Sequence, residues 1–338
     1  MLKSRLCIAF FAFAVGCAPA QKPLTDYVNP MLGTATLWDS VDLGFKPTKR
    51  TWGAEVFPGS SLPNAMVQVS PVTKFHSGAG YQYEDSVIYG FTHTNKGHWN
   101  LCHIPLLPVT GTPTPGDYCS PFSHERESAA PGYYQVFLDR YGVDAQLSST
   151  LRCAFHKYTY PAGAAASLLA DLQRSNEHVR AWDIRKEGDN VFAGWQQTGE
   201  KMYFYAVANR PVTGIEPVVE GDREVRIVRF GEGDGALELR IGFSFVSEKN
   251  ARENLEAEML GKSFAEVRSE ATATWNDLLG RIRVEGGTER EKGLFYSSLY
   301  RSFLWPALRS DVNGEFTDVD GKVINPCLLY TSDAADDK

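Results

Sequence analysis

The apolar residues of this chain change their period near residue 250. Residues 24–250 carry short apolar or alternating runs, such as Tyr133–Leu138 and Met202–Ala208, between segments rich in Gly, Pro, Asn and Asp. Many short strands at this spacing are typical of a β-sandwich and not of alternating βαβ units. From Asn254 to Ile282 the apolar residues recur at steps of three and four, which predicts one long helix with a mild interruption at Gly261.

A second helix is predicted after Gly287. Thr288 and Glu291 have the spacing of a capping box, in which each side chain hydrogen-bonds to the backbone N–H of the other residue. Pro306 should end or bend this helix. The residues expected to face inward are Leu294, Phe295, Leu299, Phe303 and Leu304. Because two helices cannot bury both of their faces, we expect a mainly β chain in which a sandwich is followed by the first helices of a larger helical domain.

The N-terminus has the pattern of a secretory signal over residues 1–20. Lys3 and Arg5 precede the apolar run Leu6–Val15, which is too short to span a bilayer. Two cleavage sites compete: a lipobox in which Cys17 would be lipidated, and an A-x-A site at Ala18–Ala20. We therefore expect an exported protein, either a periplasmic or outer-membrane lipoprotein attached through a lipid on Cys17, or a secreted protein.

Charge and cysteine content exclude several classes. The chain of 338 residues has a net charge of −7 and no long run of Lys or Arg, so nucleic acid is not an expected partner. Cys102, Cys119 and Cys153 have no C-x-x-C spacing, which argues against a zinc site; one disulfide and buried free thiols both stay open. The sequence of residues 327–338, CLLYTSDAADDK, continues neither pattern and resembles a translated adapter, so we expect a non-native tail.

Several ordered sequence blocks carry a family resemblance. They are FPGSSLPNAMVQVSP (Phe57–Pro71), GYQYEDSVIYGFTHTN (Gly80–Asn95), the segment Phe122–Pro161 that begins FSHERESAAPGYY, and LFYSSLYRSFLWPALRSDVNGEF (Leu294–Phe316). Their order resembles glycoside hydrolase family 92. The resemblance implies an N-terminal β-sandwich over residues 24–250, then a linker helix and the start of a truncated (α/α)6 catalytic domain over residues 251–326.

The resemblance also implies an activity. Members of that family are calcium-dependent exo-α-mannosidases that invert the anomeric centre, so a mannose-containing glycan is the expected partner. Inversion needs two carboxyl groups that stand far enough apart to admit a water molecule, and Ca²⁺ prefers oxygen ligands such as sugar hydroxyls. In the family the catalytic carboxylates and the calcium ligands come from later in the barrel. We therefore expect them downstream of Pro326 and expect residues 21–326 alone to be inactive.

The segment Phe91–Asn100 is the best candidate for sugar contact on the sandwich side. It is a strand end followed by a polar loop with a glycine and one large aromatic residue, and loops on rigid scaffolds commonly carry binding residues. The expected substrate-binding residues are His93, Asn95, His98 and Trp99. Here the loop departs from the family pattern after Thr94, which leaves the linkage preference open; the alternative is a hairpin in which Trp99 is structural.

The chain departs from the family a second time over residues 35–56. A loop of this length without secondary structure of its own is often functional. Trp52 within it is a candidate for stacking on a sugar, and the alternative is a loop folded on itself.

Other polar patterns have structural interpretations. Asp311–Gly314 and Asp318–Gly321 lack the spaced ligands of an EF-hand and are predicted to be Asx-Gly turns of a small hairpin. We expect Glu127 and its neighbours to be structural, and His156 to be a satisfied core histidine. No serine-hydrolase, Walker or H-E-x-x-H motif is present. Two alternatives to the mannosidase stay open: a non-catalytic carbohydrate-binding sandwich, and a glycoside phosphorylase of similar two-domain plan.

Overall fold

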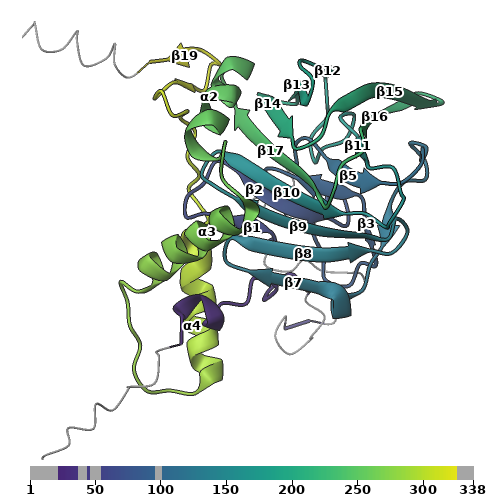
Figure 1. Ribbon diagram of the computed structural model, residues 1–338. Helices are drawn as coiled ribbons and strands as arrows, with labels where there is room; N and C mark the ends of the chain where they lie inside the picture. The colour runs from purple at the N-terminus through teal and green to yellow at the C-terminus, as the bar shows by residue number, and fades with distance from the viewer. Residues whose placement is uncertain (1–21, 37–43, 46–54, 96–100, 326–338) are drawn as a thin grey trace, which may run out of the picture.

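The computed structural model describes residues 22–36, 44–45, 55–95 and 101–325. Within these ranges the chain forms two large antiparallel sheets followed by three α-helices (Figure 1), which confirms the predicted mainly β class. The inward side chains of the two sheets form one apolar core, so the sheets make a β-sandwich. The helices lie on the outer face of one sheet and beside the sandwich.

The first sheet has, within the described residues, seven strands in the order β1–β2–β4–β5–β11–β16–β15. These strands are β1 (Ser60–Ser61), β2 (Gln68–Val72), β4 (Gly90–Thr92), β5 (Leu106–Val109), β11 (Ser167–Ala170), β15 (Val212–Glu220) and β16 (Arg223–Phe230). The central strands β2, β4, β5 and β11 are buried along their whole length.

The second sheet has, in the same described ranges, eight strands in the order β12–β13–β14–β17–β10–β9–β8–β7. These strands are β7 (Glu127–Ala130), β8 (Tyr133–Leu138), β9 (Val143–Ser149), β10 (Cys153–Thr159), β12 (Ala181–Lys186), β13 (Val191–Gln197), β14 (Lys201–Ala208) and β17 (Leu237–Ser244). Two small two-stranded sheets pair β3 (Val87–Ile88) with β6 (Ser120–Pro121) and β18 (Phe316–Thr317) with β19 (Val323–Ile324). The described residues also form the short helices η1 (Leu24–Tyr27) and η2 (His124–Arg126).

Strand β10 shows why the second sheet needs helices on its outer face. His156 and Tyr158 point into the sandwich, whereas Cys153 and Phe155 point outward and are nevertheless fully buried. Leu255 and Phe264, which lie on helices, pack against the outward side chains. A strand that is apolar on both faces is stable only where both faces are covered.

The predicted long helix over 254–282 is wrong, because the structure has two helices in this region. These are α2 (Glu248–Glu258) and α3 (Phe264–Leu279). Gly261 adopts a φ of 88°, which ends the first helix, and Ser263 with Glu266 forms a capping box that begins the second. The separation lets α2 lie on β17 and β14 while α3 crosses β9 and β10.

Helix α2 lies in direct contact with the backbone of β17. A Cβ atom at Gly242 of β17 would overlap the carbonyl oxygen of Ala251 on α2. Glycine is therefore the residue that fits between this helix and the sheet.

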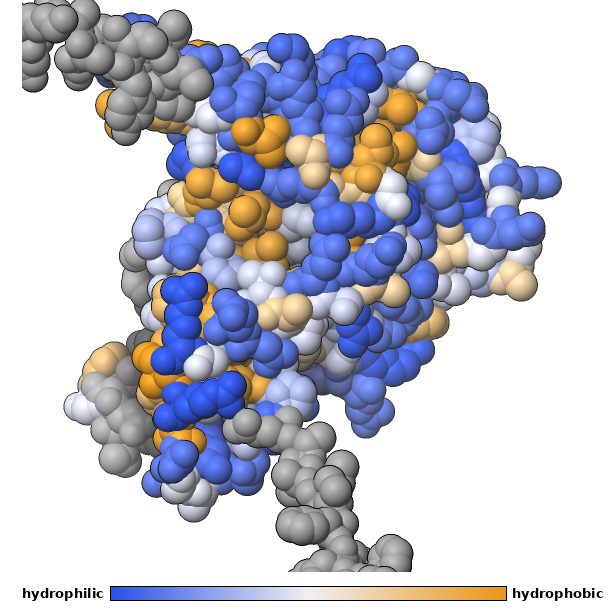
Figure 2. Space-filling model, turned by 60° about the vertical axis from the view of Figure 1, so that its left-hand side comes forward, coloured by the Kyte–Doolittle hydropathy of each residue, from blue (hydrophilic) through white to orange (hydrophobic). Residues whose placement is uncertain are grey.

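Helix α4 (Glu289–Ser302) begins at the predicted capping box, with both Thr288 and Glu291 hydrogen bonds present. Its predicted inward face is wrong in part. The buried residues of α4 are Tyr296, Ser297 and Tyr300. The two tyrosines pack against Trp275 of α3 and against η1. Leu294 and Phe295 are instead 44% and 36% exposed, and Figure 2 shows apolar residues on the surface of this helical segment.

The carboxylate of Asp311 joins the last described segment to the sandwich. It is almost fully buried and accepts hydrogen bonds from Ser244 Oγ (2.6 Å), Asn250 Nδ2 (2.9 Å) and Asn254 Nδ2 (2.7 Å). Burial raises the pKa of Asp311, and these three donors oppose the increase. A second contact lies nearby, where Arg152 pairs with Glu258 (2.6 Å) and donates to the Ser310 carbonyl (2.7 Å).

Two buried histidines lie between the sheets. His93 follows β4 of the first sheet, and its Nε2 lies 3.0 Å from Nε2 of His156 on β10 of the second. His156 Nδ1 is 2.5 Å from the Tyr158 hydroxyl, which confirms His156 as a satisfied core residue. The pKa of His93 is lowered to about 3, and that of His156 is also well below its usual value, because burial disfavours the charged rings.

The described cysteines are free thiols: Cys102 and Cys153 are buried, and Cys119 is partly buried. Among the described helices, none combines the length and apolar character that a membrane span requires. The predicted signal over 1–20, with Cys17, and the predicted tail over 327–338 lie outside the described residues.

Replacing the buried carboxylate should loosen the helical segment. We expect Asp311→Asn to lower the free energy of unfolding by about 2 kcal/mol, because an amide group would meet donors that need an acceptor. Asp320→Asn in the exposed β18–β19 turn is the matched control and should change it little. Urea denaturation measures both, and equal midpoints would contradict the assigned role of Asp311.

The buried histidine pair should make folding sensitive to acid. The unfolded chain binds protons on both rings below a pKa of about 6.5, whereas the folded chain keeps them neutral. Stability is therefore fully present above pH 6.5 and falls as the pH is lowered towards 3, by up to about 1.4 kcal/mol per pH unit for each ring. His156→Gln should flatten this slope by about one proton, whereas His178→Gln at an exposed position should not; denaturation midpoints between pH 6.5 and 4.5 test this.

Candidate functional site

The candidate sugar loop begins at the end of β4 and returns at Leu101. The two sides are paired by backbone hydrogen bonds, from Cys102 N to the Thr94 carbonyl (2.7 Å) and from His93 N to the His103 carbonyl (3.1 Å). The neighbouring strand β2 holds the same base, because Gln68 N donates to the His93 carbonyl (3.0 Å). We call residues 93–95 and 101–103 the loop base; it is a rigid extension of the first sheet.

Asn95 fastens this loop base to two strands. Its Nδ2 donates to the carbonyl oxygens of Gln68 (2.7 Å) and Thr92 (2.9 Å), and its Oδ1 accepts from the Thr92 hydroxyl (2.7 Å). The side chain is fully buried. All these partners belong to the protein, so in the described structure Asn95 acts on the path of the loop.

His93 also lies inside the sandwich. It is fully buried, and its ring is 4.5 Å from the ring of Phe243 and 5.1 Å from that of His156, measured between centroids. The structure thus brings His93 and Asn95 together at the loop base and directs both inward. Their direct contact with a sugar stays a prediction.

A chain of polar side chains runs from the loop base towards the surface. Thr198 donates its hydroxyl hydrogen to Glu177 (2.6 Å), so it accepts from His103 Nε2 (3.0 Å). The His103 Nδ1 atom is then the acceptor for the Thr94 hydroxyl (2.8 Å). This chain fixes the ring of His103, and sequence reasoning missed it because Thr198 and Glu177 are distant in the sequence.

The return side of the loop base has an unusual backbone. Leu101, Cys102 and Ile104 have φ values of 71°, 58° and 55°, in the left-handed region that bulky side chains rarely adopt. Such strain persists only where the surroundings impose it, and it is concentrated at functional sites. Here the Leu101 carbonyl is held by the Asn176 N–H (2.9 Å) and the Ser175 hydroxyl (3.0 Å).

The other predicted site residues, His98, Trp99 and Trp52, lie outside the described residues. No arrangement is therefore assigned to them, and their contact with a sugar stays a prediction.

Glu127 has a structural environment, as predicted. Its side chain is almost fully buried and accepts from Tyr81 (3.0 Å), Tyr134 (2.5 Å) and His124 Nδ1 (2.6 Å). The raised pKa values of Tyr81 and Tyr134, caused first by burial and then by this carboxylate, keep both hydroxyls as donors. Glu127 therefore joins η2 and β8 to the segment between β2 and β3, which carries Tyr81.

Metal-binding groups are absent from the part of the chain that the structure describes: no three His, Cys, Asp or Glu side chains there are placed to hold an ion. The two Asx-Gly segments are turns, as predicted. Gly314 N donates to the Asp311 carbonyl, and Gly321 N donates to the Asp318 carbonyl within the β18–β19 hairpin.

Comparison with known proteins agrees with the sandwich and the helical segment. The glycosyl hydrolase family 92 N-terminal domain matches residues 27–254, and the family 92 catalytic domain matches residues 250–335. A curated relative, an uncharacterized secreted glycosidase of the fungus Arthroderma benhamiae, is 24% identical over 344 residues, which cover 86% of this chain and 42% of the relative.

Solved structures give the same result. A family 92 α-mannosidase of Bacteroides thetaiotaomicron is 25% identical and superposes with a TM-score of 0.80 over 90% of this chain and 44% of that protein. The same enzyme has been solved in complex with mannoimidazole. An inverting family 92 mannosidase of the same species has a TM-score of 0.76 over 90% of this chain and 43% of its own, at 25% identity.

The chain thus spans less than half the length of the relatives it matches. Its two matches follow one another without a gap and cover nearly all of the described sandwich and helices. The chain belongs to glycosyl hydrolase family 92.

Proposed function

We propose that the protein to which this chain belongs removes terminal α-linked mannose from glycans, with inversion at the anomeric carbon. The observation that carries the proposal is the ordered match to both family domains, together with the TM-score of 0.80 to an α-mannosidase. The mannoimidazole complex of that enzyme supports a mannose-type ligand.

In this proposal the sandwich supplies one wall of the sugar site. The loop base is buried, hydrogen-bonded to β2 and continuous with β4, so both ends of the proposed sugar-binding loop, at Asn95 and Leu101, are fixed. A binding loop on a rigid base loses little entropy when a ligand binds. Asn95 and His93 are thus proposed to position the loop, and His98, Trp99 and Trp52 to contact the sugar.

The catalytic groups are proposed to lie beyond Pro326. Inversion requires an acid on the leaving oxygen and a base on a water molecule across the ring, with their carboxyl groups roughly 6.5–9.5 Å apart. Calcium, when bound by oxygen ligands there, would hold mannose hydroxyls. The described residues offer no such metal group, so no step is assigned to them.

Helix α4 supports a further helical layer. It buries Tyr296 and Tyr300 on one face and leaves Leu294 and Phe295 largely exposed on the other. A helix that is apolar on two sides is typical of one packed between layers. We propose that α4 is the first helix of the (α/α)6 catalytic domain.

We also propose that the protein is exported through residues 1–20, as either a lipoprotein on Cys17 or a cleaved secreted form. The secreted glycosidase among its relatives supports export. Mass spectrometry of the mature N-terminus distinguishes the two forms, because a lipidated Cys17 adds the mass of its acyl chains.

The whole protein should release mannose from an aryl α-mannoside in the presence of calcium. NMR of the first product should show β-mannose, and a chelator should abolish turnover that calcium restores. Residues 21–326 alone should show none. Release of mannose 1-phosphate by the whole protein only when phosphate is present would indicate a phosphorylase instead, and glycan binding by the whole protein without turnover would indicate a carbohydrate-binding module.

Loosening the loop base should reduce turnover. In the whole protein, Asn95→Ala removes a donor from each of two buried carbonyl groups, and we expect kcat/KM for a mannoside to fall by about tenfold or more. Asn209→Ala, which removes an amide contact between β14 and β17, is the matched control and should keep kcat/KM within about twofold. Equal activity of both variants at temperatures well below unfolding would contradict the positioning role of Asn95.

A further inference from the structure

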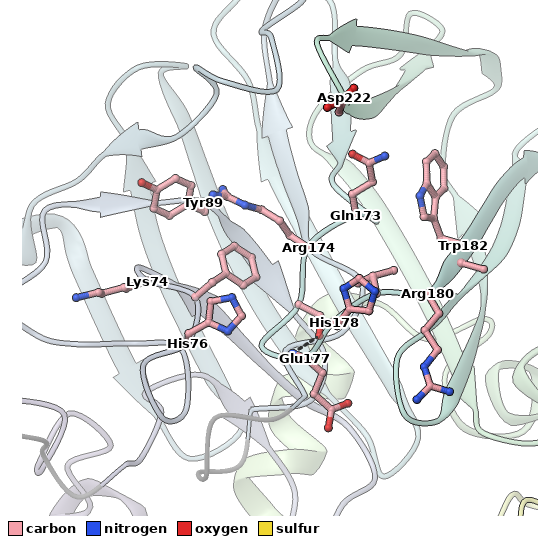
Figure 3. Close-up of a pocket in the computed structure, with 14 residues that line it drawn as sticks. Lys74, His76, Tyr89, Gln173, Arg174, Glu177, His178, Arg180, Trp182 and Asp222 are labelled. Carbon is pink, nitrogen blue, oxygen red and sulfur yellow. Dashed lines mark hydrogen bonds between the residues drawn. The ribbon is translucent and has the colours of Figure 1, made fainter.

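A pocket of about 900 Å³ lies beside the loop base (Figure 3). It opens between the segment that joins β11 to β12, the residues after β2, and the tip of the β15–β16 hairpin. Its size is within the range of small-molecule sites, roughly 300–1,000 Å³. Neither the packing of the sandwich core nor the proposed catalytic chemistry accounts for this pocket.

One wall of the pocket is an ordered cationic and aromatic platform. The Arg174 guanidinium lies 5.2 Å from the ring centroid of Phe75 and 5.1 Å from that of Tyr89. The Tyr118 hydroxyl accepts from Arg174 at 3.2 Å, and the buried Asp171 carboxylate is 3.9 Å from it. These contacts fix the guanidinium before any ligand arrives, while about a third of its side chain stays exposed.

The opposite wall carries Trp182 of β12, which Figure 3 shows across the pocket from Tyr89 and Arg174. Its indole is partly buried, and the Arg226 guanidinium lies 5.3 Å from its ring centroid. An indole ring that is anchored in this way offers a large contact area at a small entropic cost. Aromatic rings suit the apolar C–H faces of pyranose sugars.

The polar groups of the pocket include both donors and acceptors. His76 Nδ1 must donate to the Asn176 carbonyl (2.9 Å), so the neutral ring presents Nε2 as an acceptor. Glu177 and Asp222 add carboxylates that oppose the charges of Lys74 and Arg180, and the Arg174 charge is already paired with Asp171. Sugar hydroxyls both donate and accept, so this mixed set favours a neutral glycan over a phosphorylated one.

The pocket is joined to the loop base by hydrogen bonds. Ser175, which lines the pocket, and the buried Asn176 next to it both hold the Leu101 carbonyl. Glu177, another lining residue, ends the polar chain that starts at Thr94. A ligand in the pocket would therefore be coupled through these hydrogen bonds to the base of the proposed sugar-binding loop.

We propose that this pocket is a second glycan-binding site that holds a neutral mannose-containing branch of the substrate, with Trp182 and Arg174 as its main contacts. The inference rests on the proposed function for the identity of the glycan.

Titration of the 338-residue chain with neutral α-mannotetraose by calorimetry tests the proposal. We expect Trp182→Ala to weaken binding by about tenfold or more. Trp195→Ala is the matched control, because Trp195 is a partly buried tryptophan on the neighbouring strand β13 outside the pocket, and it should change binding by less than about twofold. His178 also lines the pocket. Because it is exposed, His178→Gln does not endanger folding, and it should weaken binding by about threefold.

Three results would overturn the proposal: no measurable binding by the chain, binding that both pocket variants leave unchanged, or binding of mannose 6-phosphate with none of the neutral tetraose. These results differ from a failure of the proposed function. A whole protein that releases mannose while the chain fails to bind refutes the pocket alone, and a chain that binds within a protein that does not hydrolyse refutes the mannosidase alone.

Discussion

The buried carboxylate of Asp311 determines how the two parts of this chain meet. A charged group out of water must be hydrogen-bonded, and here its three partners come from the end of β17 and from two turns of α2. The chain must therefore pass α2 again after it has formed α3 and α4. The Arg152–Glu258 pair, which also reaches the Ser310 carbonyl, gives the same path a second fixed point. The helical segment is thus held against the sandwich by polar contacts as well as by apolar area.

The eight-stranded sheet carries apolar residues on both faces, and this explains the order of the elements. Its inner face makes the sandwich core, and the middle of its outer face is buried by α2 and α3. The seven-stranded sheet then carries the loop base at the end of β4, where β2 and the buried histidine pair support it from both sides. Contacts from both sheets thus make the loop base rigid, although the loop base itself extends from the seven-stranded sheet.

The sequence pattern predicted the strands that alternate or are uniformly apolar, such as Tyr133–Leu138, which is β8. It did not predict β12 or β15, because these edge strands carry exposed polar residues on much of their length and lack the apolar signal. The capping box at Thr288 was predicted, because its two residues, Thr288 and Glu291, are only three positions apart in the sequence. The inward face of α4 could not be predicted, because it depends on contact with Trp275, which only tertiary packing brings to this helix.

For the candidate site, the sequence indicated a position along the chain but not the direction of its side chains. A polar segment after a strand pointed to the end of β4, but polarity alone could not show that His93 and Asn95 point inward, since their partners His156 and Gln68 come from other strands. The pocket beside it gave no sequence signal either. Its residues are spread from Lys74 to Asp222 and meet only when the two sheets close.

The contact between Gly242 and Ala251 has a consequence for the evolution of the protein. The backbones of β17 and α2 are in direct contact at Gly242, with no room for a side chain between them. Even a methyl group there would have to move α2 outward by about a tenth or more of the diameter of the helix. Such a shift would reach Asn250 and Asn254 and, through them, the entry to the helical region. Substitution of Gly242 should therefore be rare unless substitutions on α2 accompany it. The sequences of β17 and α2 are thus expected to change together at this contact.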